Sequence, residues 1–261
     1  MRVTEKNNLK YFQFNIFPSD RLVHGIFSRV GGVSEDSFSS LNVGGTTGDS
    51  KINVIENRNR IFNVFNKNYS SIYDVWQVHS DKVVYANSSR KDGELHLKAD
   101  AIVTDSKNIS LFMQFADCVP ILIYDPKNNV CGIAHAGWQG TVKRIVQKTI
   151  KFMVSKFESD PNQILAGIGP SIGPDHYEVG IDVVKQVQER LGEFSKEIIV
   201  HHNLKTYLNL WLSNKLLLHQ SGVTQIEVAE ICTACNLEDW FSYRMEGQKS
   251  GRFGVILGLN N

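Results

Sequence analysis

The sequence predicts an α+β fold with mixed β-sheets, formed by a single domain that spans residues 1–261. Short β-branched segments and amphipathic segments follow one another without the strict strand–helix alternation of a doubly wound fold. No linker, low-complexity tract or internal repeat divides the chain, which is long enough to bury a substantial core. A strand–turn–strand pattern over residues 119–134 is the clearest single element.

In the N-terminal half, short apolar and β-branched runs bounded by turn-forming residues are predicted to be strands. They are residues 11–16, 22–27, 75–80, 82–85, 101–104 and 109–115. Residues 50–66 carry Ile and Phe side chains at helical spacing and are predicted to form a helix. Two glycine-rich loops, residues 28–34 and 42–48, precede this helix and contain Arg29 and Asn42. Such loops let backbone approach a ligand closely, but they are also common on surfaces that bind nothing.

The central segment is predicted to be a β-hairpin. Residues 119–124 and 130–134 are apolar and β-branched, and the turn-forming residues 125–129 separate them. This hairpin would place Cys118, before its first strand, close to His135, after its second. Residues 137–140 then bend the chain into a helix, whose positive N-terminal end would point back at the same place.

The C-terminal half is predicted to contain helices that alternate with single strands. Apolar residues at helical spacing predict helices over residues 141–157, 181–191 and 208–219. Strands are predicted at residues 163–168, 226–232 and 253–259. The loop after residue 168 is rich in Gly and Pro and would offer a run of backbone N–H groups.

Composition excludes several classes of partner. The net charge of +1 argues against nucleic acid or an acidic membrane surface as a general partner. The first residues lack the apolar core of a signal peptide, and no apolar run approaches the roughly 20 residues that span a bilayer. We therefore expect a cytoplasmic protein whose cysteines are reduced thiols or metal ligands, namely Cys118, Cys131, Cys232 and Cys235.

The residue types at three predicted strand ends suggest reactive chemistry. His79, Cys118 and His135 would supply two imidazoles and a thiolate, and three protein ligands with an open fourth position are typical of catalytic zinc. The same thiolate and imidazole could equally be a nucleophile and its base. Because the ligands are far apart in sequence and form no short pair, the residues alone leave both interpretations open, as well as a purely structural one.

The sequence Cys232-Thr233-Ala234-Cys235 is a CxxC motif with no second cysteine pair elsewhere in the chain. We interpret it as structural, with redox chemistry as the alternative. His176 lies beside the glycine–proline loop and could face a substrate. The zinc deaminase motif, HxH copper pairs, GxGxxG and the phosphate-binding GxxxxGK[ST] loop are all absent.

Several motifs together resemble those of the YfiH/YlmD family, in order and in spacing. They are Ser28-Arg29-Val30-Gly31-Gly32-Val33-Ser34, Ser40-Leu41-Asn42-Val43-Gly44, Trp76-Gln77-Val78-His79-Ser80, Ala99-Asp100-Ala101, Ala116-Asp117-Cys118-Val119-Pro120, His135-Ala136-Gly137-Trp138-Gln139-Gly140, Gly167-Ile168-Gly169-Pro170-Ser171-Ile172-Gly173 and Phe241-Ser242-Tyr243-Arg244. This is the laccase-domain, or multicopper polyphenol oxidase, family, whose members are regarded as purine nucleoside phosphorylases. The resemblance covers nearly the whole chain.

The resemblance implies a layered α/β/β/α fold and a zinc ion bound by His79, Cys118 and His135. It implies phosphorolysis of adenosine, inosine, guanosine and S-methyl-5'-thioadenosine, with adenosine deaminase activity. The partners would then be a small-molecule nucleoside and phosphate, and we expect a monomer. The resemblance also suggests the roles of the remaining site residues. Catalysis would involve Cys118, His79, Asp117 and Gln77, and substrate binding Asn42, Arg58, Arg29 and Arg244.

The chain also departs from the family pattern, and two other functions stay open. Relatives often have a cysteine pair where this chain has Asp175 and His176, and paired arginines where Met245 follows Arg244. One alternative is a copper-dependent, laccase-like polyphenol oxidase that uses the same His/Cys/His ligands. The other is a cysteine hydrolase, with Cys118 as nucleophile and His135 as base, that acts on a peptidoglycan precursor.

Overall fold

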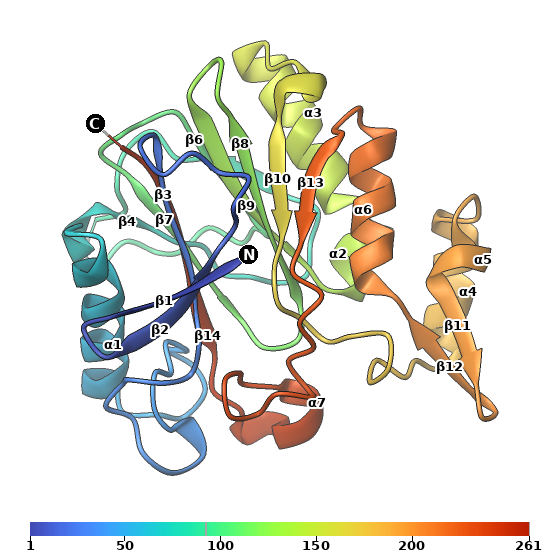
Figure 1. The fold of residues 1–261 in the computed structure, drawn as a ribbon, viewed down its shortest axis with the longest axis horizontal. Helices are drawn as coiled ribbons and strands as arrows, with labels where there is room; N and C mark the ends of the chain where they lie inside the picture. The colour runs from blue at the N-terminus through green and yellow to red at the C-terminus, as the bar shows by residue number, and fades with distance from the viewer. Residues whose placement is uncertain (92, 261) are drawn as a thin grey trace.

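Two six-stranded mixed sheets form the centre of the protein, as the computed structural model shows for residues 1–91 and 93–260 (Figure 1). The first sheet has the strand order β1 (Arg2–Lys6), β2 (Leu9–Gln13), β3 (Leu22–Phe27), β14 (Phe253–Leu259), β7 (Ser110–Phe115), β4 (Ile72–Tyr73). The second has the order β13 (Gln225–Val228), β10 (Leu165–Ile168), β8 (Val119–Asp125), β9 (Val130–Ala136), β6 (Ala101–Thr104), β5 (Val83–Tyr85). Among the strands described, the parallel pairs lie at sheet edges: β4 with β7, β5 with β6 and β10 with β13.

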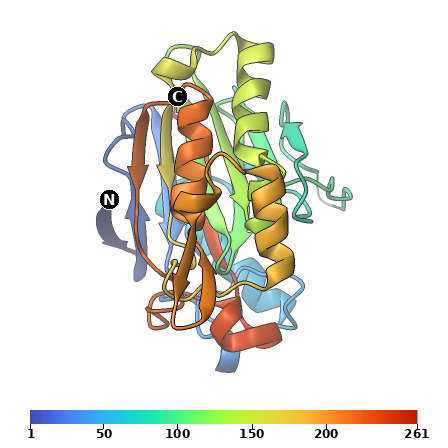
Figure 2. The same ribbon diagram turned by 90° about the vertical axis from the view of Figure 1, so that its right-hand side faces the viewer.

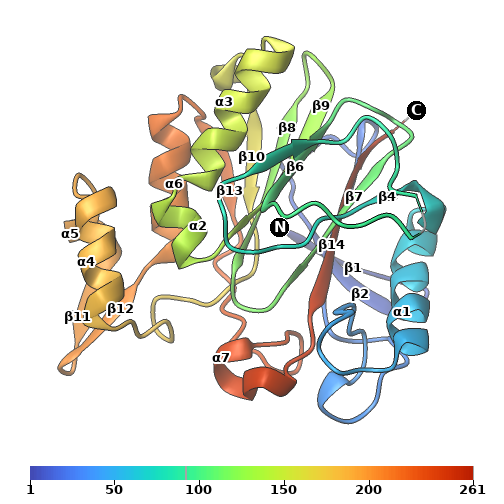
Figure 3. The same ribbon diagram turned by 180° about the vertical axis from the view of Figure 1, so that it is seen from behind.

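Helices cover the outer faces of both sheets. Helix α1 (Lys51–Val64) packs on the first sheet, on the far side from α2 (Trp138–Val142), α3 (Ile145–Phe157) and α6 (Leu210–Gln220), which cover the second (Figure 3). In the view of Figure 2, α3 and the orange helix α6 run side by side. The predicted α/β/β/α layering is confirmed.

Three apolar clusters fill the spaces between these layers. One lies between the sheets and includes Phe115, Trp240 and Phe253. The others lie between the first sheet and α1 and between the second sheet and its helices. Because both faces of the central strands are covered, β8, β9 and β14 are buried at every position and have nearly continuous apolar sequences.

A smaller unit extends from the side of the second sheet. It consists of α4 (Ile181–Arg190), α5 (Ser195–Ile198) and a two-stranded sheet of β11 (Ile199–His202) and β12 (Lys205–Leu208) (Figure 1). The short helix α7 (Tyr243–Glu246) lies near the end of the chain, before β14. Within the described residues, no helix has both the length and the apolar character needed to cross a membrane.

The predicted strand over residues 75–80 is wrong. Only Trp76 pairs there, in an isolated bridge to Lys98, and His79 takes a left-handed backbone conformation with φ of 56°. The N–H groups of Val78, His79 and Ser80 donate to the carboxylate of Asp100 instead of to a neighbouring strand. Side-chain capture of these backbone donors therefore replaces the expected sheet pairing.

The predicted helix over residues 141–157 is two helices. Helix α2 begins at Trp138 and ends after one turn at Val142, and Arg144, with φ of 63°, separates it from α3. The Arg144 guanidinium holds this break by donating to Glu193, Gln220 and the carbonyl of Arg190. The strand predicted at residues 226–232 ends early, at Val228, because Glu230 also takes a left-handed conformation.

Candidate active site

His79, Cys118 and His135 meet at one end of the second sheet. Their ligand atoms all lie within 4.8 Å of one another, and Cys118 Sγ is 3.7 Å from His79 Nε2. Cys118 directly precedes β8, and His135 lies in β9 opposite Pro120, so the central hairpin joins them as expected. His79 comes from the irregular segment after Trp76, and its ring centroid is 4.9 Å from that of His135.

The carboxylate of Asp100 organises both histidines. It lies just before β6, is fully buried, and Oδ1 accepts a hydrogen bond from His135 Nδ1 at 2.9 Å. The same oxygen accepts from the backbone N–H of His79 at 3.0 Å, and Oδ2 accepts from the N–H and hydroxyl of Ser80. A carboxylate on one ring nitrogen leaves the other nitrogen of His135 free to bind a metal.

Gly137 leaves the space that the cluster needs. A Cβ atom at this position would lie 2.7 Å from Cys118 Sγ and 3.2 Å from the His79 ring. Its φ of −70° is open to any residue, so the requirement is close approach and not backbone conformation. Helix α2 begins at the next residue, as expected, although it is a single turn.

The charged groups of the cluster stabilise one another's ionised forms. Burial raises the pKa of the Cys118 thiol, but the nearby imidazoles of His135 and His79 outweigh it and lower that pKa to about 6. Burial lowers the pKa of His135, but the Cys118 thiolate and the Asp100 carboxylate raise it to about 9. In the metal-free protein a thiolate–imidazolium pair is therefore the favoured state near neutral pH.

A cavity of about 320 Å³ opens over this cluster. Its lining residues are His79, Asp117, Cys118, Gly137, Trp138, Gln139, Ile172, Tyr177, Tyr243 and Arg244. The Arg244 guanidinium donates to the carbonyls of His176 and Glu178 and lies 5.1 Å from the centre of the Tyr177 ring. The cavity thus combines a cation, several aromatic rings and the His/Cys/His cluster, which suits an anionic or aromatic ligand.

Asp117 shapes the cavity wall through its neighbours. Its backbone is left-handed, with φ of 76°, and its carboxylate accepts from Thr233 Oγ1 at 2.7 Å and from the Arg244 N–H at 2.6 Å. The strained conformation of Asp117 directly precedes Cys118, so these two hydrogen bonds help to fix the thiol in place.

Gln77 and Arg58 lie at a neighbouring cavity of about 370 Å³. The Gln77 amide donates to the carbonyl of Gln114 and accepts from its N–H, so it pairs with the backbone of β7. Arg58 donates twice to the carbonyl of Val43 and forms an ion pair with Asp74. Neither residue lines the cavity over the His/Cys/His cluster.

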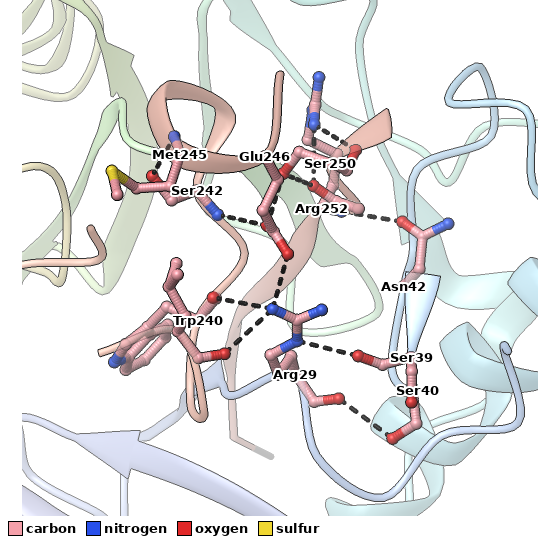
Figure 4. A network of polar contacts seen from close by, with 12 residues as sticks. Arg29, Ser39, Ser40, Asn42, Trp240, Ser242, Met245, Glu246, Ser250 and Arg252 are labelled. Atoms are coloured by element: carbon pink, nitrogen blue, oxygen red, sulfur yellow. Dashed lines mark hydrogen bonds and ion pairs between the residues drawn. The ribbon is translucent and has the colours of Figure 1, made fainter. Parts of the chain in front are cut away.

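Arg29 and Asn42 hold loops together (Figure 4). Arg29 donates to the Ser39 carbonyl, pairs with Glu246 at 2.9 Å and stacks on Phe241. The Asn42 amide is fully buried and is hydrogen-bonded on both of its ends. One of these bonds is accepted from the Arg252 N–H, and the guanidinium of Arg252 lies 5.6 Å from the ring centre of Tyr243 in the cavity wall.

The sequence alone indicates no function for two residues of the site, Asp100 and Arg252. Asp100 occurs in a family-like motif, but its sequence context indicates no role, because an isolated acid before a strand carries no signal of its own. Arg252 lies in the loop before the last strand, and burial lowers its pKa although the Cys118 and Asp117 charges oppose that change. Only the fold shows that either residue lies beside the cluster.

Comparisons with known proteins cover nearly the whole chain. The family model for multi-copper polyphenol oxidoreductase laccase matches residues 23–260. Purine nucleoside phosphorylase YlmD of Bacillus subtilis (strain 168) is 36% identical over 248 residues, or 91% of this chain and 88% of the relative. A purine nucleoside phosphorylase of Deinococcus radiodurans is 34% identical over 243 residues, or 93% and 91%. The crystal structure of YlmD from Geobacillus stearothermophilus is similar with a TM-score of 0.92 and 30% identity, covering 99% of this chain and 98% of that one.

Proposed function

The chain belongs to the multi-copper polyphenol oxidoreductase laccase family, and on that premise we propose that it is a zinc-dependent purine nucleoside phosphorylase. We propose adenosine, inosine, guanosine and S-methyl-5'-thioadenosine as substrates, with deamination of adenosine as a side activity. The observation that carries the proposal is the His79–Cys118–His135 cluster beneath a cavity lined by Arg244 and aromatic rings. The names of relatives at 34–36% identity support the same reaction.

The donor set fits a zinc ion. Two imidazoles and one thiolate are ligands that zinc prefers, and three protein ligands leave a position for water or substrate. Asp100 fixes the ring of His135, and Gly137 leaves room beside the Cys118 sulfur. Bound zinc would supply Lewis acidity and would lower the pKa of a coordinated water molecule.

In the proposed phosphorolysis, a phosphate oxygen forms a bond to the anomeric carbon of the ribose as the bond to the purine nitrogen breaks. The purine leaves with a proton, and ribose-1-phosphate remains. Positive charge from Arg244, with Arg252 behind Tyr243, favours the phosphate dianion in the cavity. The rings of Trp138, Tyr177 and Tyr243 provide apolar surface against which the purine can stack.

The other site residues take supporting roles in this proposal. Asp117, Asn42 and Arg29 hold the cavity wall, because their polar groups are bound to other parts of the chain. Arg58 and Gln77 are proposed contacts for any part of the substrate that reaches the neighbouring cavity. For the deaminase activity, water would add to the purine carbon that carries the amino group, and ammonia would leave.

The test is incubation of metal-analysed protein with adenosine, with and without phosphate, followed by chromatographic separation of the products. Phosphate-dependent formation of adenine and ribose-1-phosphate is expected, and Cys118→Ala should abolish it. Cys131→Ala is the matched control, because Cys131 is buried between the sheets and lines neither cavity. A Cys118→Ala protein that keeps phosphorolysis would falsify the assignment. Inosine formed without phosphate would make the protein chiefly a deaminase.

One arrangement favours a second candidate, a cysteine hydrolase. Cys118, His135 and Asp100 have the order of a nucleophile, a base and a carboxylate that orients the base, and the Cys118 pKa is lowered to about 6. Metal content separates the two functions, because a thiolate bound to zinc is not a free nucleophile. Rapid alkylation of Cys118 in freshly purified protein, with no zinc bound, would favour the hydrolase. Oxygen uptake with phenols after copper loading would favour the oxidase.

A further inference from the structure

A second group of potential metal ligands is linked to the first by the hydrogen bond from Thr233, between Cys232 and Cys235, to Asp117, which precedes Cys118. Asp175 and His176 come from the loop between β10 and α4, and Cys232 and Cys235 from the segment after β13. Their ligand atoms all lie within 4.8 Å of one another. The two cysteines of the CxxC motif therefore lie beside two further potential metal ligands. These are an aspartate and a histidine that lie more than 50 residues earlier in the chain.

The individual distances are close to those around a tetrahedral ion, although His176 Nδ1 and Asp175 Oδ2, 2.9 Å apart, would have to separate slightly. Cys235 Sγ is 3.3 Å from His176 Nδ1 and 3.1 Å from Asp175 Oδ2, and Cys232 Sγ is 3.9 Å from His176 Nδ1. Zinc bonds of about 2.0–2.3 Å place the ligand atoms of a tetrahedron about 3.3–3.8 Å apart. The Gly173 N–H donates to Cys232 Sγ at 3.2 Å, as backbone amides do to metal-bound thiolates. Asp175 and Cys235 are exposed, so small side-chain rotations can complete the geometry.

We propose that Asp175, His176, Cys232 and Cys235 form a second, structural zinc site. Two thiolates, an imidazole and a carboxylate match the preference of zinc, and four protein ligands close the coordination sphere. Zinc binding displaces the protons of the Cys232 and Cys235 thiols, and these protons pass to solvent. A surface hollow of about 530 Å³, lined in part by Asp175, Cys232 and Cys235, gives the ion access.

The position of the site indicates what the ion would stabilise. Thr233, between the two cysteines, donates from its hydroxyl to Asp117, and its N–H donates to the Ser171 carbonyl. The carbonyl of His176 accepts from the Arg244 guanidinium. A zinc ion here would link the segment of Thr233 to the loop of His176. Because these two segments bind Asp117 and Arg244, the ion would stabilise the wall of the first cavity. The proposal does not depend on which reaction that cavity supports.

The test is the zinc content of protein purified under reducing conditions, measured by elemental analysis. We expect two zinc ions per chain in the natural protein and one in Cys235→Ser or Asp175→Ala, whose exposed side chains can be changed without disturbing the core. Cys118→Ala should also contain one, and the double variant Cys118→Ala/Cys235→Ser none. Cys131→Ala removes a buried thiol outside both clusters and should keep two.

Cobalt substitution identifies which site is filled. In the Cys118→Ala background, Co²⁺ should give the strong thiolate-to-cobalt absorption of a two-thiolate site, and Cys235→Ser in that background should lose it. The proposal is overturned if the natural protein holds one zinc that disappears in Cys118→Ala, or if Cys235→Ser leaves the zinc content unchanged. Neither readout uses enzymatic activity, so a failure of the proposed phosphorylase reaction leaves this test intact.

Discussion

Asp100 shows how much of the candidate site depends on one buried carboxylate. It binds the ring of His135 and the backbone of residues 78–80, so it sets the positions of two of the three proposed zinc ligands. Burial raises its pKa, but the His135 hydrogen bond and charge outweigh that and lower the pKa to about 2. The carboxylate is therefore charged at neutral pH.

Replacing Asp100 by Asn should weaken metal binding without removing a ligand. The amide cannot satisfy the donors of His135, His79 and Ser80 together, so we expect a 10–100-fold loss of zinc affinity, measured by competition with a chelator. Asp105→Asn is the matched control, because Asp105 is exposed and contacts Tyr85 outside the cluster. Unchanged affinity in Asp100→Asn would contradict the role given to Asp100.

His24 makes folding stability depend on pH. The ring is fully buried among Phe14 and Phe17, and Nε2 accepts from the Phe14 N–H. Burial, with a contribution from the Arg2 charge, lowers its pKa from 6.5 to about 4. The unfolded chain therefore binds a proton more readily than the folded one, and the stability due to neutral His24 is complete above pH 6.5 and is lost as the pH falls through 4.

We expect His24 to contribute a loss of roughly 3 kcal/mol in the free energy of unfolding between pH 7 and pH 4. The free energy of unfolding, measured with urea at both pH values, should therefore fall less in His24→Gln than in the natural protein, by about that amount. Gln can still accept from the Phe14 N–H. His219→Gln changes an exposed histidine and should leave the slope unaltered. An equal pH dependence of the free energy of unfolding in His24→Gln and in the natural protein would refute this explanation.

At the scale of elements, the strands and helices with strong patterns were predicted well. The hairpin of β8 and β9 is predictable because two apolar runs flank a turn-forming segment, and the helix α1 because Ile and Phe side chains recur at helical spacing. Residues 75–80 have the composition of a strand, but Asp100 captures their N–H groups. The break at Arg144 was also missed, because its left-handed backbone is held by Glu193 and Gln220, which lie far away in sequence.

The turn between β9 and α2 should tolerate no side chain at residue 137. In Gly137→Ala the new methyl group would press on Cys118 Sγ, so we expect metal content to fall while the fold, checked by circular dichroism, is retained. Gly45→Ala is the matched control, because, among the described residues beyond its chain neighbours, the nearest atom to its added Cβ is the Arg58 Nη2 at 3.9 Å. Full metal occupancy in Gly137→Ala would show that the site accommodates the methyl group.

At the scale of the whole molecule, the sequence predicts the α+β class but not which strands are neighbours. The last strand, β14, lies between β3 and β7 in the centre of the first sheet; its apolar sequence indicates burial on both faces but not which strands lie beside it. The layered arrangement was expected only through the family resemblance. The same limit applies to the Asp175–His176–Cys232–Cys235 cluster, whose two halves meet only in the folded chain.

The contact between the two sheets can be tested at Gly167. A Cβ on this residue of β10 would overlap the ring of Phe14, which follows β2. Gly167→Ala should therefore lower the free energy of unfolding by about 1–3 kcal/mol. Combining it with Phe14→Leu should cost less than the sum of the single variants, because the smaller side chain frees space. Strictly additive values would show that the two residues do not press on each other.

The proposed zinc ligands His79, Cys118 and His135 meet at one end of the second sheet, and none of them is close in sequence to another. Their supports, β8 and β9, pack on both faces into apolar clusters whose buried residues include none of the three ligands, so the framework should form before the ion arrives. Removal of the ion by a chelator should then be reversible in the native protein. Such a protein can persist folded but inactive when no metal is bound. Its enzymatic activity would then depend on the concentration of metal in its surroundings and not on the rate of protein synthesis.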